Sequence, residues 1–135
     1  MEHNISRRSG QQAWQFLQDY GPAALILDAL DAGTETVAAE LAKGGFDLVL
    51  VAHNTHPLES LAARLRDHEG VSVTLCRWEP GNSNSATVLA AQCADHNIGA
   101  VCAVHAKDHT DLVQLALQKK GQRSRWLPAA EVIGY

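Results

Sequence analysis

Short apolar runs alternate with amphipathic segments along most of this chain. Four runs of five or six residues, rich in Val, Leu, Ile and Ala, predict strands at Ala23–Leu27, Asp47–Ala52, Val71–Cys76 and Gly99–Val104. Apolar residues at helical spacing predict helices at Gln11–Tyr20, at Thr34–Lys43, from Pro57 to Leu65, at Ser85–His96 and at Thr110–Lys119. Continuous apolar strands are typically covered on both faces, and short strand–helix alternation is typical of parallel sheets. The pattern therefore predicts an α/β fold in three layers.

The last third of the chain is expected to complete this sheet. The helix at Ser85–His96 should turn its inner face to the sheet, and that face comprises Val88, Leu89, Gln92 and Cys93. The helix at Thr110–Lys119 carries Leu112, Leu115 and Ala116. Val132-Ile133 is the candidate for a short edge strand, and Pro128 argues against a long one. The sheet should therefore have four to five strands.

The length and composition indicate a single domain over residues 1–135. The chain has 135 residues, of which 46% are hydrophobic, enough for one sizeable core. Residues 1–22 form a polar tail and a short helix in this interpretation, and residues 23–106 form the strand–helix core. Residues 107–135 add the final helix and the edge segment.

The first part of the strand–helix core has a sequence similar to that of a known protein family. Residues 24–52, ALILDALDAGTETVAAELAKGGFDLVLVA, give the strand, turn, helix and strand of a nucleotide-binding βαβ unit. They resemble the start of the short-chain dehydrogenases/reductases, and the likeness reaches about Ala106. The run AAELAKGGFDLVLVAHNTHPLESLAARL is similar to the family's ELAxxG-x-DLVLVAR-R-x-x-x-LExLAxxL. Since family members are much longer, the resemblance implies a truncated Rossmann-like fold that corresponds to their N-terminal half.

The phosphate-binding turn of that family, T-G-x-x-x-G-x-G, has lost its glycines in this chain. When this motif is aligned with the chain without gaps, its three glycines fall on Asp28, Ala32 and Thr34. Such a turn needs glycine because the backbone must approach the anion closely, often with positive φ. Asp28 and Asp31 also add negative charge beside the expected pyrophosphate. We therefore expect no cofactor.

Three positions would carry any remaining affinity for NAD or NADP. Gly33 and Thr34 stand at the start of the predicted helix, and Glu79 aligns with the family's adenine-contacting residue. The family's catalytic Ser and Tyr-x-x-x-Lys have no counterpart, because neither Tyr20 nor Tyr135 begins that motif. Without them there is no proton donor for carbonyl reduction.

Polar residues follow the predicted strands where a doubly wound sheet binds its ligands. With the strand order 3-2-1-4, Asp28, His53 and His105 would lie side by side as candidate catalytic residues. His53, His56 and His105 are the alternative ligands for a divalent metal. However, loops are commonly polar, the chain has seven histidines, and H-x-x-H across a turn is not the helical H-E-x-x-H spacing. We therefore expect no metal site.

Composition excludes several other classes. A net charge of −4 gives no basic footprint for nucleic acid, and no stretch approaches membrane-spanning length. Three cysteines without C-x-x-C spacing are expected to be buried, reduced thiols, and a cytoplasmic protein follows as the default. A phospho-receiver is disfavoured because the third strand ends at Cys76 with no acceptor Asp nearby.

The sequence therefore favours a non-catalytic domain with a structural, scaffolding or regulatory role, either as a homo-oligomer or beside a catalytic partner protein. Degenerate halves of this kind occur as structural subdomains of polyketide ketoreductases. The alternative is a small oxidoreductase-like or other enzyme, or a ligand-binding protein, that uses the crevice at the strand ends. An open margin at the fourth strand places the expected interface at Thr110–Lys119 and Trp126–Ile133. Trp78 and Trp126 are interpreted as packing over the sheet edge, or alternatively as interface anchors.

Overall fold

The computed structural model describes residues 10–30, 32–78, 85–103 and 110–133. In chain order its elements are α1 (Gly10–Tyr20), β1 (Ala23–Ile26), α2 (Thr34–Lys43), β2 (Asp47–Ala52), the 3₁₀ helix η2 (His56–Leu58), α3 (Glu59–Glu69), β3 (Val73–Arg77), α4 (Ser85–Gln92), β4 (Ile98–Cys102), α5 (Thr110–Lys119), β5 (Arg125–Trp126) and α6 (Ala129–Ile133). Within these residues no helix is both long and apolar enough to cross a membrane.

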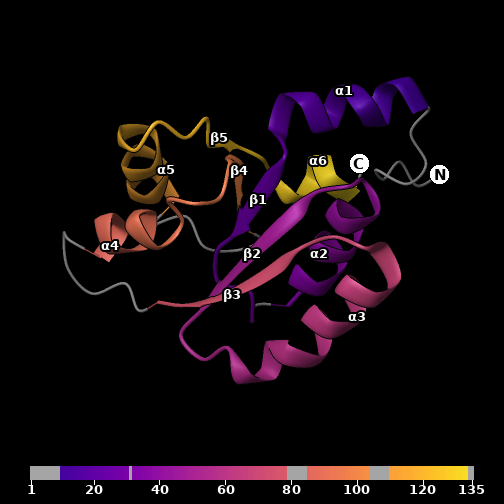
Figure 1. Ribbon diagram of the computed structural model, residues 1–135, viewed down its shortest axis with the longest axis horizontal. Helices are drawn as coiled ribbons and strands as arrows, with labels where there is room; N and C mark the ends of the chain where they lie inside the picture. Colours follow the sequence, from indigo (N-terminus) through magenta and orange to yellow (C-terminus); the bar gives the residue numbers. More distant parts are fainter. Residues whose placement is uncertain (1–9, 31, 79–84, 104–109, 134–135) are drawn as a thin grey trace.

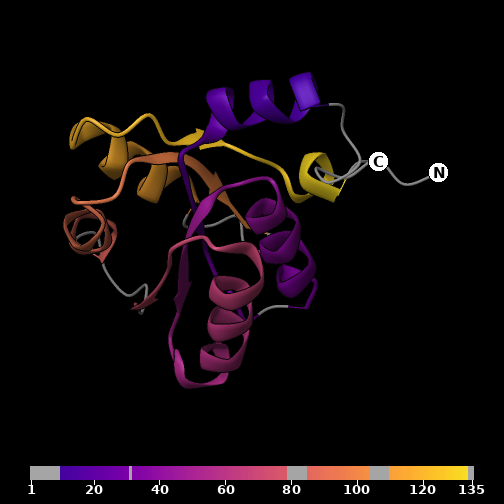
Figure 2. The ribbon, with the colours of Figure 1, turned by 45° about the vertical axis from the view of Figure 1, so that its right-hand side comes forward.

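The strands form one parallel sheet with the order β3-β2-β1-β4-β5. The first four strands therefore have the order 3-2-1-4 that was assumed for the candidate site, and the predicted α/β class is confirmed. Figures 1 and 2 show α2 and α3 on one side of the sheet and α4 and α5 on the other. The side chains of β1 pack alternately into two hydrophobic cores, one on each side of the sheet, because successive side chains of a strand point to opposite faces. Ile26 packs in the core beneath α2 and α3, and Leu25 packs beneath α4 and α5.

The fifth strand lies elsewhere than predicted. It is the two-residue β5, whereas Val132 is fully buried within the helix α6. Leu127 still donates its backbone N–H to the Val101 carbonyl at 2.9 Å, but Pro128 has no N–H with which to continue the pairing. Proline suits the start of a helix, and α6 begins at the next residue. The chain therefore turns back over the side of α2, which α6 contacts.

The inward face of α4 also differs from the prediction. Leu89 and Cys93 are buried as expected, but Val88 and Gln92 are exposed, and Ala86 and Ala90 are buried in their place. The helix SATVLAAQ has small or apolar residues on several sides, so periodicity alone does not select the side that meets the sheet.

The helix α1 closes the end of the sheet where the strands begin. Its Phe16 ring lies 5.7 Å from the ring of Phe46 and 5.0 Å from that of Tyr20. Arg123 donates from Nη2 to the carbonyl oxygens of Gln18 and Asp19, both at 2.8 Å. A cation at the C-terminal end of a helix stabilises its unpaired carbonyls. These contacts tie α1 to the segment before β5.

Candidate functional site

The turn between β1 and α2 is held from both sides by the sheet. Leu27 donates its N–H to the Cys102 carbonyl at 2.9 Å, and Ala29 donates to the Val51 carbonyl at 2.8 Å. Between them the half-buried Asp28 has φ 51°, in the left-handed region that favours glycine. Aspartate is among the few other residues that adopt this region. The backbone therefore has a glycine-like bend at the position where the resemblance places the first glycine.

The helix α2 begins directly after this turn. Gly33 is its N-cap with φ 90°, and no side chain caps the helix. Thr34 is fully buried, and its hydroxyl oxygen has no hydrogen-bond partner in the part of the chain that the structure describes. Glu35 stands in the first turn, and its Oε1 lies 2.5 Å from Nη2 of Arg64 on α3. Carboxylates near a helix N-terminus are stabilised by the helix dipole, so this acidic start is favourable for the helix itself.

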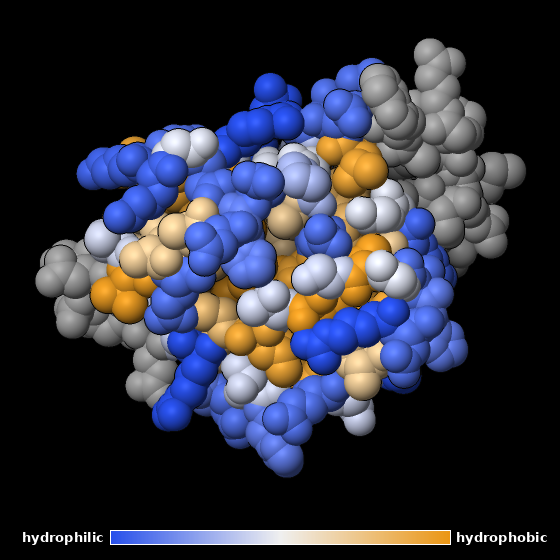
Figure 3. Space-filling view, viewed as in Figure 1, coloured by the Kyte–Doolittle hydropathy of each residue, from blue (hydrophilic) through white to orange (hydrophobic). Residues whose placement is uncertain are grey.

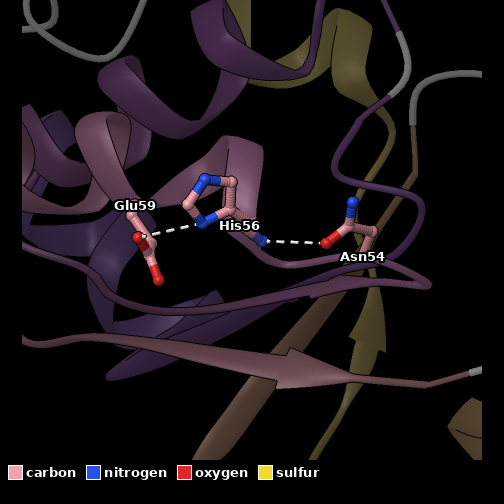
Figure 4. A network of polar contacts seen from close by, with 3 residues as sticks. All are labelled: Asn54, His56 and Glu59. Atoms are coloured by element: carbon pink, nitrogen blue, oxygen red, sulfur yellow. Dashed lines mark hydrogen bonds and ion pairs between the residues drawn. The ribbon is translucent and has the colours of Figure 1, made fainter.

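Among the described residues, two open hollows lie along the carboxyl ends of β1, β2 and β3. One, of about 470 Å³, is lined by His53, Asn54, Thr55, His56, Glu59 and Arg77. Within it Asn54 Oδ1 accepts a hydrogen bond from the His56 backbone N–H at 3.2 Å, and His56 Nδ1 lies 3.4 Å from Glu59 Oε2 (Figure 4). The other, of about 340 Å³, lies between the β1–α2 turn and the start of α3, and Leu30, Gly33, Glu35, Pro57 and Arg64 are among its lining residues.

The structure brings part of the predicted site together. Asp28 and His53 follow the neighbouring strands β1 and β2 at one edge of the sheet, and His53 and His56 line the same hollow. His105 and Glu79 lie outside the described residues, so the catalytic set, the metal set and the adenine contact stay predictions. Among the residues described, no three His, Cys, Asp or Glu side chains gather as a metal site would require.

Three charged residues of this edge were absent from the sequence-based prediction. Arg77 ends β3 and lines the hollow of His53, while Glu35 and Arg64 pair across α2 and α3 beside the turn. The position of Arg77 at the end of a predicted strand was a usable signal. The pairing of Glu35 with Arg64 had no sequence signal, because they are 29 residues apart on separate helices.

The cysteines do not supply a nucleophile. All three are buried and unpaired, as expected. Burial raises the pKa of the Cys93 and Cys102 thiols to about 12, with the nearby Cys76 as a second cause for Cys93. The reactive form of cysteine is the thiolate, so these side chains stay protonated and inert near neutral pH.

No protein-family model matches the chain, and no curated protein matches it either. Solved structures do resemble it. A short-chain dehydrogenase from Sphingobium yanoikuyae in complex with NADPH has a TM-score of 0.54 and 25% identity over 74% of this chain and 44% of its own. An alcohol dehydrogenase from Thermococcus sibiricus complexed with 5-hydroxy-NADP has a TM-score of 0.62 and 19% identity over 78% and 56% of the two chains.

A putative short-chain dehydrogenase from Escherichia coli CFT073 has a TM-score of 0.66 and 15% identity over 82% of this chain and 63% of its own. The chain thus spans about two fifths to three fifths of the length of these three proteins. The strand order, the helix layers and these similarities agree: the chain has a short-chain dehydrogenase/reductase-like, Rossmann-type fold.

Proposed function

We propose that this chain is a non-catalytic short-chain-dehydrogenase-like domain that acts as a structural, scaffolding or regulatory subunit and does not bind NAD or NADP. The observation that carries the proposal is Asp28, which stands with φ 51° in the β1–α2 turn. The turn keeps a bend suited to glycine, but a carboxylate side chain is attached at that bend.

Charge at the turn disfavours a dinucleotide. A pyrophosphate at the N-terminus of α2 would meet the carboxylate of Asp28, whereas the charge of Glu35 is balanced by its ion pair with Arg64. Two like charges about 5 Å apart repel by about 3 kcal/mol at an effective dielectric constant of about 20. Such a repulsion corresponds to a loss of affinity of about a hundredfold for each close pair.

The start of α2 adds a steric argument. The third glycine of a dinucleotide-binding turn allows close packing between helix and strand. Thr34 fills that position with a fully buried side chain. Its hydroxyl oxygen lacks a partner among the described residues, and burying such a group costs about 1–3 kcal/mol. This turn therefore accommodates a side chain where a nucleotide-binding turn has none.

Catalytic residues of the family are also missing from these 135 residues, because neither Tyr20 nor Tyr135 begins a Tyr-x-x-x-Lys motif. The proton donor that carbonyl reduction requires is therefore absent from the sequence given. This supports a role in which the fold itself, rather than a reaction, is used.

Calorimetric titration with NADPH and NADH tests the proposal, with the Sphingobium yanoikuyae dehydrogenase as a positive control for NADPH. We expect no saturable heat from this chain at millimolar cofactor, and the variant Asp28→Asn separates the effect of charge from that of shape. A micromolar dissociation constant for the unmodified chain would overturn the proposal. It would favour the alternative, a small enzyme or ligand-binding protein that uses the hollows at the strand ends.

A further inference from the structure

One edge of the sheet has no neighbouring strand among the described residues. The strand order β3-β2-β1-β4-β5 places β3 at that edge. The pairing of β2 with β3 includes the hydrogen bond from the Leu48 N–H to the Ser72 carbonyl at 2.9 Å. Since the backbone groups of successive residues in a strand point to opposite sides, this register turns the N–H and C=O groups of Val73, Leu75 and Arg77 away from β2.

The residues of this edge are suited to pairing with a further strand. The strand β3, VTLCR, carries no charge before its last residue. Val71 and Leu75 are half-buried and pack against the core beneath α2 and α3. Figure 3 shows hydrophobic side chains in the middle of the view, where β3 runs in Figure 1, with hydrophilic side chains lying across them. An uncharged edge strand of this kind is a template to which another strand adds.

The side chain of Arg66 reaches one end of this edge from α3. Its Nε donates to the Val73 carbonyl oxygen at 3.1 Å, and its Nη2 donates to the same oxygen. A carbonyl oxygen has two lone pairs, so these two donors leave it no capacity for a further hydrogen bond. The charge of the guanidinium makes both bonds stronger than those between neutral groups. Arg64, the other arginine of α3, pairs instead with Glu35 on α2.

We propose that the β3 edge is a self-association surface that Arg66 holds closed. The strand that fits the edge is β3 of a second copy, because the outward N–H and C=O groups are self-complementary. An antiparallel pair centred on Leu75 sets Leu75 opposite its own copy and Val73 opposite the Arg77 of the other copy. The Val73 carbonyl would then have to accept from the N–H of that Arg77, but Arg66 already occupies this carbonyl.

Charge opposes the same pairing. Val73, Leu75 and Arg77 are two residues apart in the strand, so their side chains point to the same face of the sheet. In the antiparallel pair, the Arg77 side chain of one copy would lie beside Val73 of the other and close to the guanidinium of Arg66. Like charges opposite each other on a sheet are destabilising. The closure depends on the β3 edge and not on the β1–α2 turn, so this proposal and that of the previous subsection fail separately.

Sedimentation velocity over a concentration series from about 1 to about 300 µM tests the closure. The variant is Arg66→Ala, and the matched control Arg64→Ala removes the same charge from the same helix. A hydrogen bond from a charged group contributes a factor of about ten or more, so Arg66→Ala should associate at a concentration at least about tenfold lower than the control. The control should sediment as the unmodified chain does. Circular dichroism establishes that each variant is folded. If the alanine variants do not fold, Arg66→Met and Arg64→Met replace them, because methionine keeps the aliphatic length and removes the donors.

Hydrogen exchange locates the contact. In the associated Arg66→Ala variant the outward N–H of Leu75 should become protected, while Leu50 in the central strand β2 should keep the protection that it has in the unmodified chain. Adding Leu75→Lys sets two positive charges opposite each other in the middle of the pair and should reverse the association. Three results would overturn the proposal: Arg66→Ala that sediments as the control does, association that leaves the Leu75 N–H unprotected, or association that Leu75→Lys does not weaken.

Discussion

The replacement Gly99→Ala should remove a large part of this protein's free energy of unfolding. Gly99 is a buried residue of β4, and the end of α1 passes directly over it. A Cβ at this position would lie 2.1 Å from the Gly21 carbonyl oxygen and 2.4 Å from that of Tyr20. Ordinary contacts are about 3.5 Å, so the two backbone segments must separate by about 1 Å or more.

The magnitude follows from what that separation disturbs. Both contacting atoms belong to the backbone, so no flexible side chain can relieve the overlap. Overpacking of a core costs about 1–3 kcal/mol. Displacing α1 also exposes Phe16 and weakens the hydrogen bonds from Arg123 to the carbonyls that end the helix, and exposing one such aromatic side chain costs about 2 kcal/mol. The free energy of unfolding should therefore fall by about 4 kcal/mol, a large part of the 5–15 kcal/mol of a typical domain.

Equilibrium unfolding in urea, followed by circular dichroism, measures the change. The matched control is Gly70→Ala at the end of α3, where a Cβ meets nothing within 4 Å but φ is 69°. That control should lose only about 1–2 kcal/mol, from backbone strain. If Gly99→Ala lost no more than Gly70→Ala, the close approach of α1 to β4 would not exist in solution, and the packing of α1 described above would be wrong.

Two further changes test the two cores, one on each side of the sheet: Cys102 lies in the core beneath α2 and α3, and Trp78 in the core beneath α4 and α5. Burial raises the pKa of Cys102 to about 12, so above the ordinary thiol pKa of about 8.5 the unfolded chain loses a proton that the folded chain keeps. From this group the free energy of unfolding should therefore fall by up to about 1.4 kcal/mol per pH unit as the pH rises. The variant Cys102→Ala should flatten the dependence of the unfolding free energy on pH between about pH 9 and 11. An unchanged slope in the variant would contradict the burial of the thiol. Trp78 is buried and donates from Nε1 to the Ser85 carbonyl at 2.8 Å, so Trp78→Phe should cost about 1–2 kcal/mol in the same urea experiment, and no loss would argue against that hydrogen bond.

Local signals in the sequence predicted the first half of the sheet well. The bounds of α2 and β2 match the structure residue for residue, because Gly44 and Gly45 end the helix and a run of six residues covered on both faces fills the strand. The end of the chain was harder to predict. The two residues of β5 are a strand only because β4 lies beside them, and no local pattern of two residues encodes such pairing.

For the candidate site, the sequence predicted which residues lie at the strand ends but not the contacts between separate helices. The rule that ligands bind at the carboxyl ends of parallel strands placed Asp28 and His53 at one edge. The left-handed backbone at Asp28 was not predicted: the alignment marked the position as one where the family has glycine, and periodicity carries no information on φ. Contacts between distant helices, such as Glu35 with Arg64, depend on how α2 and α3 pack and leave no trace in spacing. The exposure of Val88 was missed for the same kind of reason, since packing decides which side of an apolar helix meets the sheet.

The central claim is that the β1–α2 turn holds no dinucleotide, and amide chemical shifts in a ¹⁵N-labelled sample test it most directly. NADPH is added to millimolar concentration while the amide signals of Asp28, Gly33 and Thr34 in the turn, and of His53 and His56 in the adjoining hollow, are followed. Non-saturating shifts no larger than those elsewhere on the surface are the predicted result. Saturable shifts that move together in the turn and in the hollow would contradict the account, because only a nucleotide bound across the strand ends reaches both.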